Sequence, residues 1–65
     1  MRVLLRNPRR ELAVDGPLSV VALLQRLEVA PGSVLVIADG TLVPVDAILA
    51  DDADVEIRPV ISGGS

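Results

Sequence analysis

The chain of 65 residues contains no cysteine, no histidine, no lysine and no aromatic residue. Without cysteine, neither a disulfide nor a zinc–thiolate site can stabilise the fold. Without histidine, a metal would have to be held by carboxylates alone, which argues against a transition metal. The core must therefore be aliphatic, and 25 valine, leucine and isoleucine residues make one small domain of this length plausible.

The same absences argue against catalysis by this chain. A serine without a histidine or lysine base nearby is a poor nucleophile. Asp51, Asp52 and Asp54 could be interpreted as paired acid and base groups. Their setting, Ala-Asp-Asp-Ala-Asp, is more typical of a solvated turn that leads into a strand. We therefore expect a protein that is not an enzyme and that binds no cofactor or metal of its own.

Charge and hydropathy limit the partners and the location. The net charge of −3 argues against nucleic acid or an anionic membrane as a direct partner. No apolar run approaches transmembrane length and no signal peptide is visible, so a cytoplasmic location is expected. Codon usage in GC-rich DNA is the favoured explanation for the absence of lysine. Whatever its origin, this absence leaves no ε-amine through which copies could be joined by isopeptide bonds.

The first part of the chain predicts a β-hairpin. Residues Arg2 to Arg6 are aliphatic and flanked by charge, which is typical of a strand. Asn7-Pro8-Arg9 predicts a turn, because proline fixes φ at the first central position. From Glu11 to Asp15 apolar and polar residues alternate, which predicts a second strand with one buried face.

A helix is predicted next. Ser19 is a suitable N-cap, since its hydroxyl can accept from an unpaired backbone N–H of the first turn. Leu18 and Leu23 fall at the positions of a hydrophobic staple around it. One face of the helix collects apolar residues at helical spacing, and Pro31-Gly32 ends the helix by about Glu28.

The second half predicts three further strands. Val34 to Ala38 is apolar on both alternating faces, and Asp39-Gly40 is a strong two-residue hairpin signal. Leu42-Val43 begins the return strand, which Pro44 ends or confines to an edge. Residues 46–52 form a short connection, for which one turn of helix around Ala47-Ile48-Leu49 is an option. The last strand runs from Val55 to Val60.

One helix can cover only one face of so small a sheet, so the other face must meet water or a partner. The strand that is apolar on both sides places either Val34 and Val36 or Leu35 and Ile37 on that open face. An exposed aliphatic patch favours a binding surface, although ordinary surface apolarity remains the alternative.

The chain finishes in Ser62-Gly63-Gly64-Ser65, directly after the apolar pair Val60-Ile61. Glycines have no Cβ, so such a tail can lie in a channel too narrow for other residues. That property suits an enzyme that must reach and activate a terminal carboxylate. A slack terminus or a remnant of cloning would give the same residues.

Taken together, these segments resemble the ThiS/MoaD group of ubiquitin-like sulfur carriers over the whole chain. The pieces that carry the resemblance are the opening hairpin 2–15, the helix signal 19–24, the hairpin 36–44, the segment 51–57 and the ending Val60-Ile61-Ser62-Gly63-Gly64. Each piece is weak alone, whereas the ordered set is fairly specific.

The resemblance implies an α+β fold of the ubiquitin-like β-grasp type, with a mixed four- to five-stranded sheet, one main helix on one face and the last strand beside the first. It divides the chain into a domain, residues 1–61, and a flexible tail, residues 62–65. It also implies the partners: an E1-like adenylyltransferase that uses ATP and Mg²⁺, a sulfur donor or sulfurtransferase, and a downstream sulfur-accepting enzyme.

By position, the resemblance implies that Gly64 is adenylated and then holds the sulfur as a thiocarboxylate. Recognition of the tail falls to Ile61, Ser62 and Gly63. The implied contacts with the activating enzyme are Val34, Val36, Arg58 and Val60. The alternatives without a binding role are that Ile61 packs at the edge of the core and that Arg58 is an ordinary solvated charge on a strand.

Ser65 departs from the family pattern, which ends in a free Gly-Gly carboxylate. Trimming by a metalloprotease or an artefact of cloning is preferred over an inactive relative. The short, lysine-free body most resembles carriers for tRNA 2-thiouridine, with thiamine thiazole and molybdopterin synthesis as close rivals. The alternative from another class is a ubiquitin-like interaction module that uses its open face and never its tail, or a protein modifier.

Overall fold

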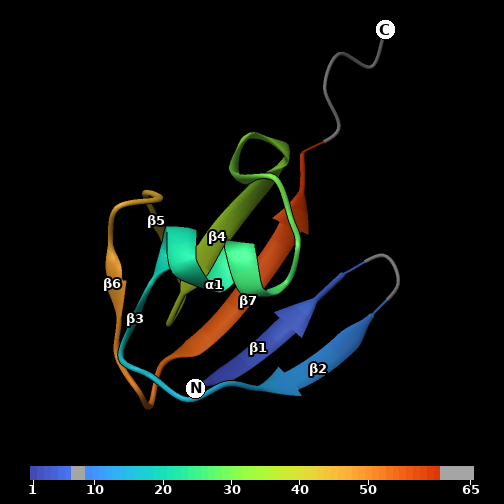
Figure 1. The fold of residues 1–65 in the computed structure, drawn as a ribbon. Helices are drawn as coiled ribbons and strands as arrows, with labels where there is room; N and C mark the ends of the chain where they lie inside the picture. Colours follow the sequence, from blue (N-terminus) through green and yellow to red (C-terminus); the bar gives the residue numbers. More distant parts are fainter. Residues whose placement is uncertain (7–8, 61–65) are drawn as a thin grey trace, which may run out of the picture.

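The computed structural model describes residues 1–6 and 9–60. Within them, five strands form one mixed sheet in the order β2-β1-β7-β4-β5, and two short strands, β3 and β6, form a second ladder (Figure 1). The elements in chain order are β1 (Arg2–Leu5), β2 (Arg10–Ala13), β3 (Leu18–Ser19), α1 (Val20–Arg26), a 3₁₀ helix (Pro31–Ser33), β4 (Val34–Ala38), β5 (Thr41–Val43), β6 (Ile48–Leu49) and β7 (Asp54–Pro59).

The first and last strands lie side by side at the centre of the sheet. β1 pairs with β7 in parallel, with Val3 opposite Val55, while β2 and β4 flank them in antiparallel register. Both central strands therefore end at the same edge of the sheet. This arrangement confirms the ubiquitin-like β-grasp fold and the predicted opening hairpin.

Helix α1 forms where the sequence predicts it and provides much of the core. The Ser19 hydroxyl accepts from the backbone N–H of Ala22 at 3.2 Å, which confirms the predicted N-cap. Val20, Leu23 and Leu24 are completely buried beneath the helix. Burial of one such side chain stabilises the fold by about 1.5–3 kcal/mol. The helix ends at Arg26, slightly earlier than expected, and Glu28 adopts a positive φ of 57°.

The Asp39-Gly40 turn is confirmed in detail. Ala38 pairs with Thr41, and the two residues between them have φ angles of 50° and 83°. Positive φ at both central positions is characteristic of a type I′ hairpin. The Asp39 carboxylate also accepts from the N–H of Asp54 at 3.1 Å, which holds the turn against the start of β7.

The predicted helical turn around Ala47-Ile48-Leu49 is wrong. Ile48 and Leu49 form β6, which pairs with β3, and Leu49 is buried while Ile48 is exposed. The reason lies in the helix N-terminus, whose first N–H groups have no partner within the helix. The N–H of Val20 donates to the carbonyl of Ala47 at 2.9 Å. Ala47 lies directly before β6, so this segment provides the acceptor that the helix N-terminus lacks while it pairs with β3.

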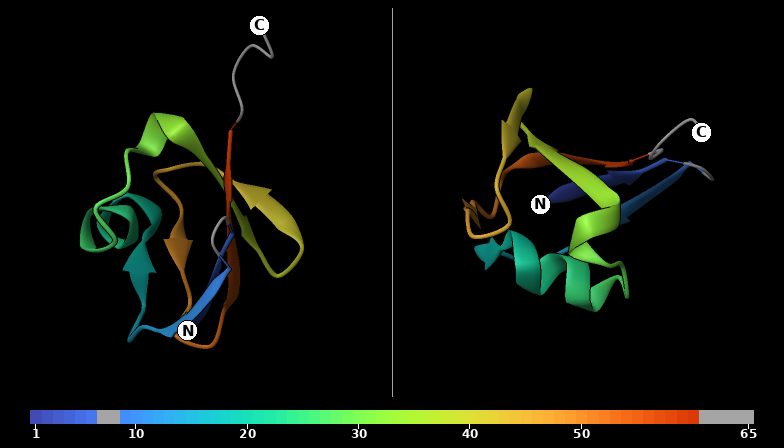
Figure 2. Two further views of the ribbon diagram at one scale, coloured as in Figure 1. Left: turned by 90° about the vertical axis from the view of Figure 1, so that its right-hand side faces the viewer. Right: turned by 90° about the horizontal axis from the view of Figure 1, so that it is seen from above.

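All helical structure in the described residues lies on one side of the main sheet (Figure 2). The side that faces α1 carries the aliphatic core, whose buried members are Val3, Val20, Leu23, Leu24, Val36, Leu49, Ala53, Val55 and Ile57. No polar or charged residue among the described positions is buried. The second face of the sheet is therefore left open, as the sequence predicts.

Candidate functional site

The open face of the sheet is a cross-strand surface of aliphatic and charged side chains. Register places Leu4 beside Glu56, Glu56 beside Ile37, and Ile37 beside Leu42. Leu35 lies beside Arg58 in the same way. We define the open face by these strand residues and the adjoining Arg6, namely Leu4, Arg6, Leu35, Ile37, Leu42, Glu56 and Arg58.

Two leucines give this face its apolar character. Leu35 is 45% exposed and Leu42 is 60% exposed, although neither side chain is polar. Large aliphatic residues this exposed, on the neighbouring strands β4 and β5 of a small domain, favour a protein-binding surface. Leu4 and Leu42 were not among the predicted contacts. Two signals in the sequence could have found them. The alternation of side chains along β1 places Leu4 on the face opposite the buried Val3, and Leu42 lies in the return strand after the Asp39-Gly40 turn.

The predicted placement of Val34 and Val36 on the open face is wrong. Val36 is only 3% exposed and belongs to the core, and Val34 packs against that core from the same side. Leu35 and Ile37 occupy the open face instead. Both pairs are apolar, so the sequence pattern did not distinguish them; the pairing of Val36 with the buried Ile57 decides the side.

The middle of the open face is slightly hollowed. The hollow is lined by Leu4, Ile37, Asp39, Gly40, Asp54, Val55 and Glu56. Three of these seven residues are acidic, and Asp54 lies at the start of β7, away from the end of that strand. The hollow therefore combines aliphatic side chains with negative charge.

Charged groups cluster near the end of β7, where Glu56 bridges two arginines. Arg58 Nε donates to Glu56 Oε2 at 2.7 Å, and Arg6 Nε donates to the same oxygen at 2.9 Å. The bond from Arg58 is the main cause that lowers the pKa of Glu56, assisted by Arg6 and opposed by partial burial. Glu56 is thus held as a carboxylate between two half-exposed guanidinium groups.

A second ion pair lies on the same face but far from the end of β7. Arg2 Nε donates to Glu11 Oε2 at 2.7 Å between β1 and β2. The hydrogen bond from Arg2 to Glu11 is the main cause that raises the pKa of Arg2. It is solvent-exposed and therefore contributes little to stability.

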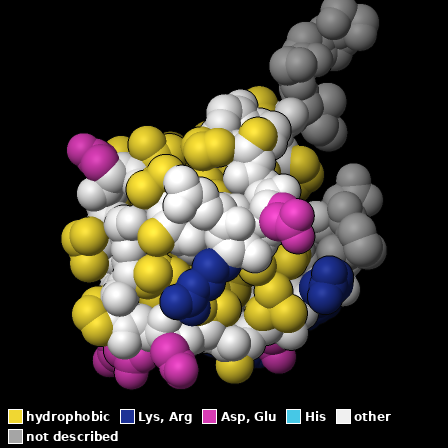
Figure 3. Space-filling view, in the orientation of Figure 1, with side chains coloured by type: hydrophobic (Ala, Val, Ile, Leu, Met, Phe, Trp, Pro, Cys, Tyr) yellow, Lys and Arg dark blue, Asp and Glu magenta, His cyan; other side chains and the backbone are white. Residues whose placement is uncertain are grey.

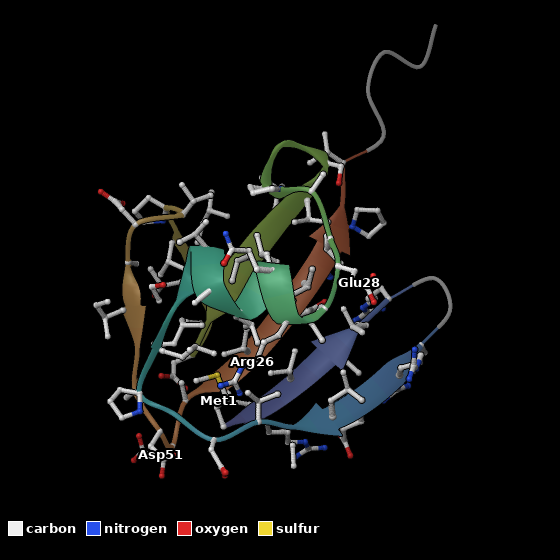
Figure 4. The ribbon with its side chains drawn as sticks, viewed as in Figure 1. Met1, Arg26, Glu28 and Asp51 are labelled. Carbon is white, nitrogen blue, oxygen red and sulfur yellow. The ribbon has the colours of Figure 1, made fainter. Side chains whose placement is uncertain are left out.

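The opposite side of the molecule has a different charge pattern. Figure 4 shows Arg26 and Glu28 at the C-terminal end of α1, on the side away from the open face. Acidic side chains gather along the lower edge in Figure 3, the edge at which Figure 4 places Asp51. Asp51 there accepts from the N–H of Gly16 at 2.7 Å, so it has a structural role in a turn.

The end of β7 sets where the C-terminal segment leaves the domain. The backbone N–H of Val60 donates to the carbonyl of Ser33 at 2.9 Å, and the Val60 side chain is 41% exposed. Arg58 is also exposed, so both residues lie where the predicted contacts with an activating enzyme require them, and those contacts stay a prediction. The predicted tail residues, Ile61, Ser62, Gly63 and Gly64, and the boundary between residues 61 and 62, lie outside the described residues.

Two kinds of site are not found in the part of the chain that the structure describes. No group of three or more acidic side chains there is arranged to hold a metal ion. No helix in residues 1–6 and 9–60 is long and apolar enough to cross a membrane.

Comparison with known proteins identifies the family. No curated protein matches this chain. The model of the ThiS family matches residues 3–64, which is nearly the whole sequence and includes the glycine pair. The β-grasp sheet and its single covered face agree with that match. The chain therefore belongs to the ThiS family, whose members are small sulfur carriers rather than catalysts and act with an E1-like activating enzyme and sulfur-transfer partners.

Proposed function

We propose that this chain carries sulfur as a thiocarboxylate on Gly64. The observation that carries the proposal is the ThiS family match, which extends through residue 64. An aliphatic scaffold without cysteine, histidine or lysine agrees with it, because the reactive group of such a carrier is its own terminus.

The chemistry begins with activation of the Gly64 carboxylate. A carboxylate oxygen attacks the α-phosphorus of ATP in the activating enzyme, pyrophosphate leaves, and an acyl-adenylate forms. Hydrosulfide can then attack the carbonyl carbon and expel AMP, which gives the thiocarboxylate without any change of oxidation state. A persulfide donor would instead give an acyl disulfide, from which a second thiol releases the thiocarboxylate by reduction.

The carrier contributes position to this reaction. Docking of the open face through Leu35 and Ile37 would hold the end of β7 at the entrance of the enzyme, so that the tail reaches ATP. Fixing two reactants in this way converts a bimolecular step into an effectively unimolecular one. In the printed sequence Gly64 is joined to Ser65, and activation requires the form that ends at Gly64. Where the cell makes the protein with Ser65, a metalloprotease is our candidate for its removal.

The test compares three forms of the carrier that end at Ser65, Gly64 or Gly63. Each is incubated with the host's E1-like enzyme, ATP, Mg²⁺ and sulfide, and followed by pyrophosphate exchange and intact mass. We expect exchange and replacement of one oxygen by sulfur only in the form that ends at Gly64. If that form is never adenylated while it folds normally, the proposal is wrong.

The sulfur acceptor is chosen by the downstream enzyme. We favour the 2-thiouridine of tRNA or the thiazole of thiamine, and place molybdopterin third. Deletion of the gene, followed by assays of tRNA thiolation, thiamine requirement and molybdoenzyme activity, separates the three pathways. The pathway whose product disappears, and returns with the wild-type gene, identifies the acceptor.

An interaction module that binds through the open face and not through its tail is the second candidate, and the exposed Leu35 and Leu42 favour it. The form that ends at Gly63 distinguishes the two. A carrier loses its cellular function when Gly64 is removed, whereas a binding module keeps its function and loses it only when the open face is changed.

A further inference from the structure

The arginines of the Arg6–Glu56–Arg58 cluster are half exposed and have further hydrogen-bond donors besides those that contact Glu56. Both arginines bond to Glu56 through Nε. This leaves the N–H groups on the two Nη atoms of each guanidinium available for other acceptors. Among the described residues, the hydrogen bonds and ion pairs of Arg6 and Arg58 go to Glu56 and to no second acceptor. The arginine side chains are 50% and 52% exposed, whereas Glu56 is 25% exposed, so the cations lie outermost.

We propose that Arg6 and Arg58 form a carboxylate-binding clamp, positioned by Glu56, which receives an acidic side chain at the mouth of the tail channel of the activating enzyme. The inference rests on the proposed function for the identity of that enzyme. Glu56 is a positioning residue here, because it touches the two arginines and not the partner. Only Arg58 was expected at the interface; Arg6 and Glu56 are additions.

The geometry favours a ligand that matches a planar, forked donor. Guanidinium groups bind carboxylates through paired N–H bonds, and a guanidinium already fixed at Nε loses less side-chain freedom when it does so. One carboxylate fixes both arginines from adjacent strands, since Arg6 follows β1 and Arg58 belongs to β7. The cluster keeps a net positive charge on a chain whose net charge is −3.

A carboxylate of the enzyme is favoured over a phosphate of ATP because of reach. Gly64 lies six residues beyond Arg58. An extended tail of that length spans about 20 Å. If the tail lies extended when Gly64 meets the α-phosphate, Arg58 is too far away to touch the same nucleotide. In that geometry, the group that Arg58 meets belongs to the entrance of the channel.

The distribution of charge along the open face favours one orientation of the carrier as it approaches the enzyme. The arginine clamp lies at the end where β1 and β7 finish, whereas Asp39, Asp54 and the Arg2–Glu11 pair lie at the other end, which has a net negative charge. An acidic channel mouth would attract the first end and repel the second. Such complementarity acts mainly on the rate of encounter and on specificity. It would thus bring the tail end of the carrier to the channel first.

The test measures activation and binding in variants that keep the carbon stems of the arginines. Arg6→Gln and Arg58→Gln are compared with wild type, all ending at Gly64, in the pyrophosphate exchange assay. We expect KM for the carrier to rise roughly tenfold in each, with kcat nearly unchanged, because the contact is made equally before and during the chemical step. The rise should shrink at high salt. Unchanged KM in both variants overturns the clamp.

Arg2→Gln is the matched control, because it removes an arginine–glutamate pair from the same face at the other edge of the sheet. It should leave KM unchanged. Glu56→Gln tests positioning: it makes the surface more positive, so simple attraction predicts a lower KM, whereas a positioning role predicts a higher one. A lower KM overturns the assignment of Glu56. Far-UV circular dichroism verifies that each variant folds.

Direct binding to the activating enzyme separates the remaining alternatives. A carboxylate partner predicts that Arg58→Gln weakens binding equally with and without ATP, whereas contact with phosphate would weaken it only with ATP and would overturn the proposal. If wild type binds but is never adenylated, the proposed function fails and the clamp is still judged by the binding constants. If wild type does not bind at all, both fail.

Discussion

The assignment of the two faces of β4 can be tested with a pair of neighbouring substitutions. Val36 is 3% exposed and Leu35 is 45% exposed, although both are aliphatic residues of one strand. Val36→Ala removes two methyl groups from a packed site, which costs about 1.6 kcal/mol in transfer free energy at about 0.8 kcal/mol per group. The cavity left behind adds to this cost. We expect Val36→Ala to lower the free energy of unfolding by about 2 kcal/mol.

Leu35→Ala removes more carbon but should cost less stability. Much of the leucine side chain already contacts solvent, and surface substitutions usually change stability by about 0.5 kcal/mol or less. Its effect should instead appear in function, as a higher KM for the carrier in the activation assay. The two substitutions are thus predicted to have different effects: Val36→Ala lowers stability, and Leu35→Ala weakens partner binding.

Urea denaturation followed by far-UV circular dichroism is the suitable assay, because the chain has no aromatic residue for fluorescence. A domain of this size has only a few kcal/mol of stability in all, so a loss of about 2 kcal/mol is easily measured. If Leu35→Ala destabilises the protein as much as Val36→Ala does, the sides of the sheet have been assigned wrongly.

Three further predictions concern stability. Ser19→Ala removes the N-cap bond to Ala22, and should lower the free energy of unfolding by about 1 kcal/mol in urea denaturation. Gly40→Ala forces a Cβ into a position with φ of 83°, and should cost about 1–2 kcal/mol although there is space around it. Because the pKa of Glu56 is lowered in the folded state, its pairing contributes stability above about pH 4.3 that is lost as the pH falls through the lowered value. Glu56→Gln should remove this part of the acid dependence in denaturation measured at several pH values, and an identical pH profile would contradict it.

Local signals in the sequence were sufficient for the elements whose structure is decided locally. Ser19 caps the helix through an N–H three residues away, and Asp39-Gly40 makes its turn with two adjacent backbone angles. Such features need no knowledge of the rest of the chain. The parallel pairing of β1 with β7 is different, because it joins opposite ends of the sequence; the family resemblance implied it, and periodicity did not.

The features that were missed depend on distant partners. Strand β6 pairs with β3, and Ala47, the residue before it, accepts from the N–H of Val20 at the helix N-terminus. The sides of β4 depend on which residues of β7 lie opposite, with Ile57 buried and Arg58 exposed. The role of Glu56 depends on Arg6, fifty residues away. None of these relations has a local signature.

The intact mass of the carrier after activation tests the central claim most directly. The chain that ends at Gly64 is incubated with the E1-like enzyme, ATP, Mg²⁺ and sulfide, and its C-terminal peptide is then identified by fragmentation. We predict that one oxygen of the Gly64 carboxylate is replaced by sulfur, and that omission of ATP prevents the change. An unaltered C-terminus on a folded carrier that binds the enzyme would contradict the claim.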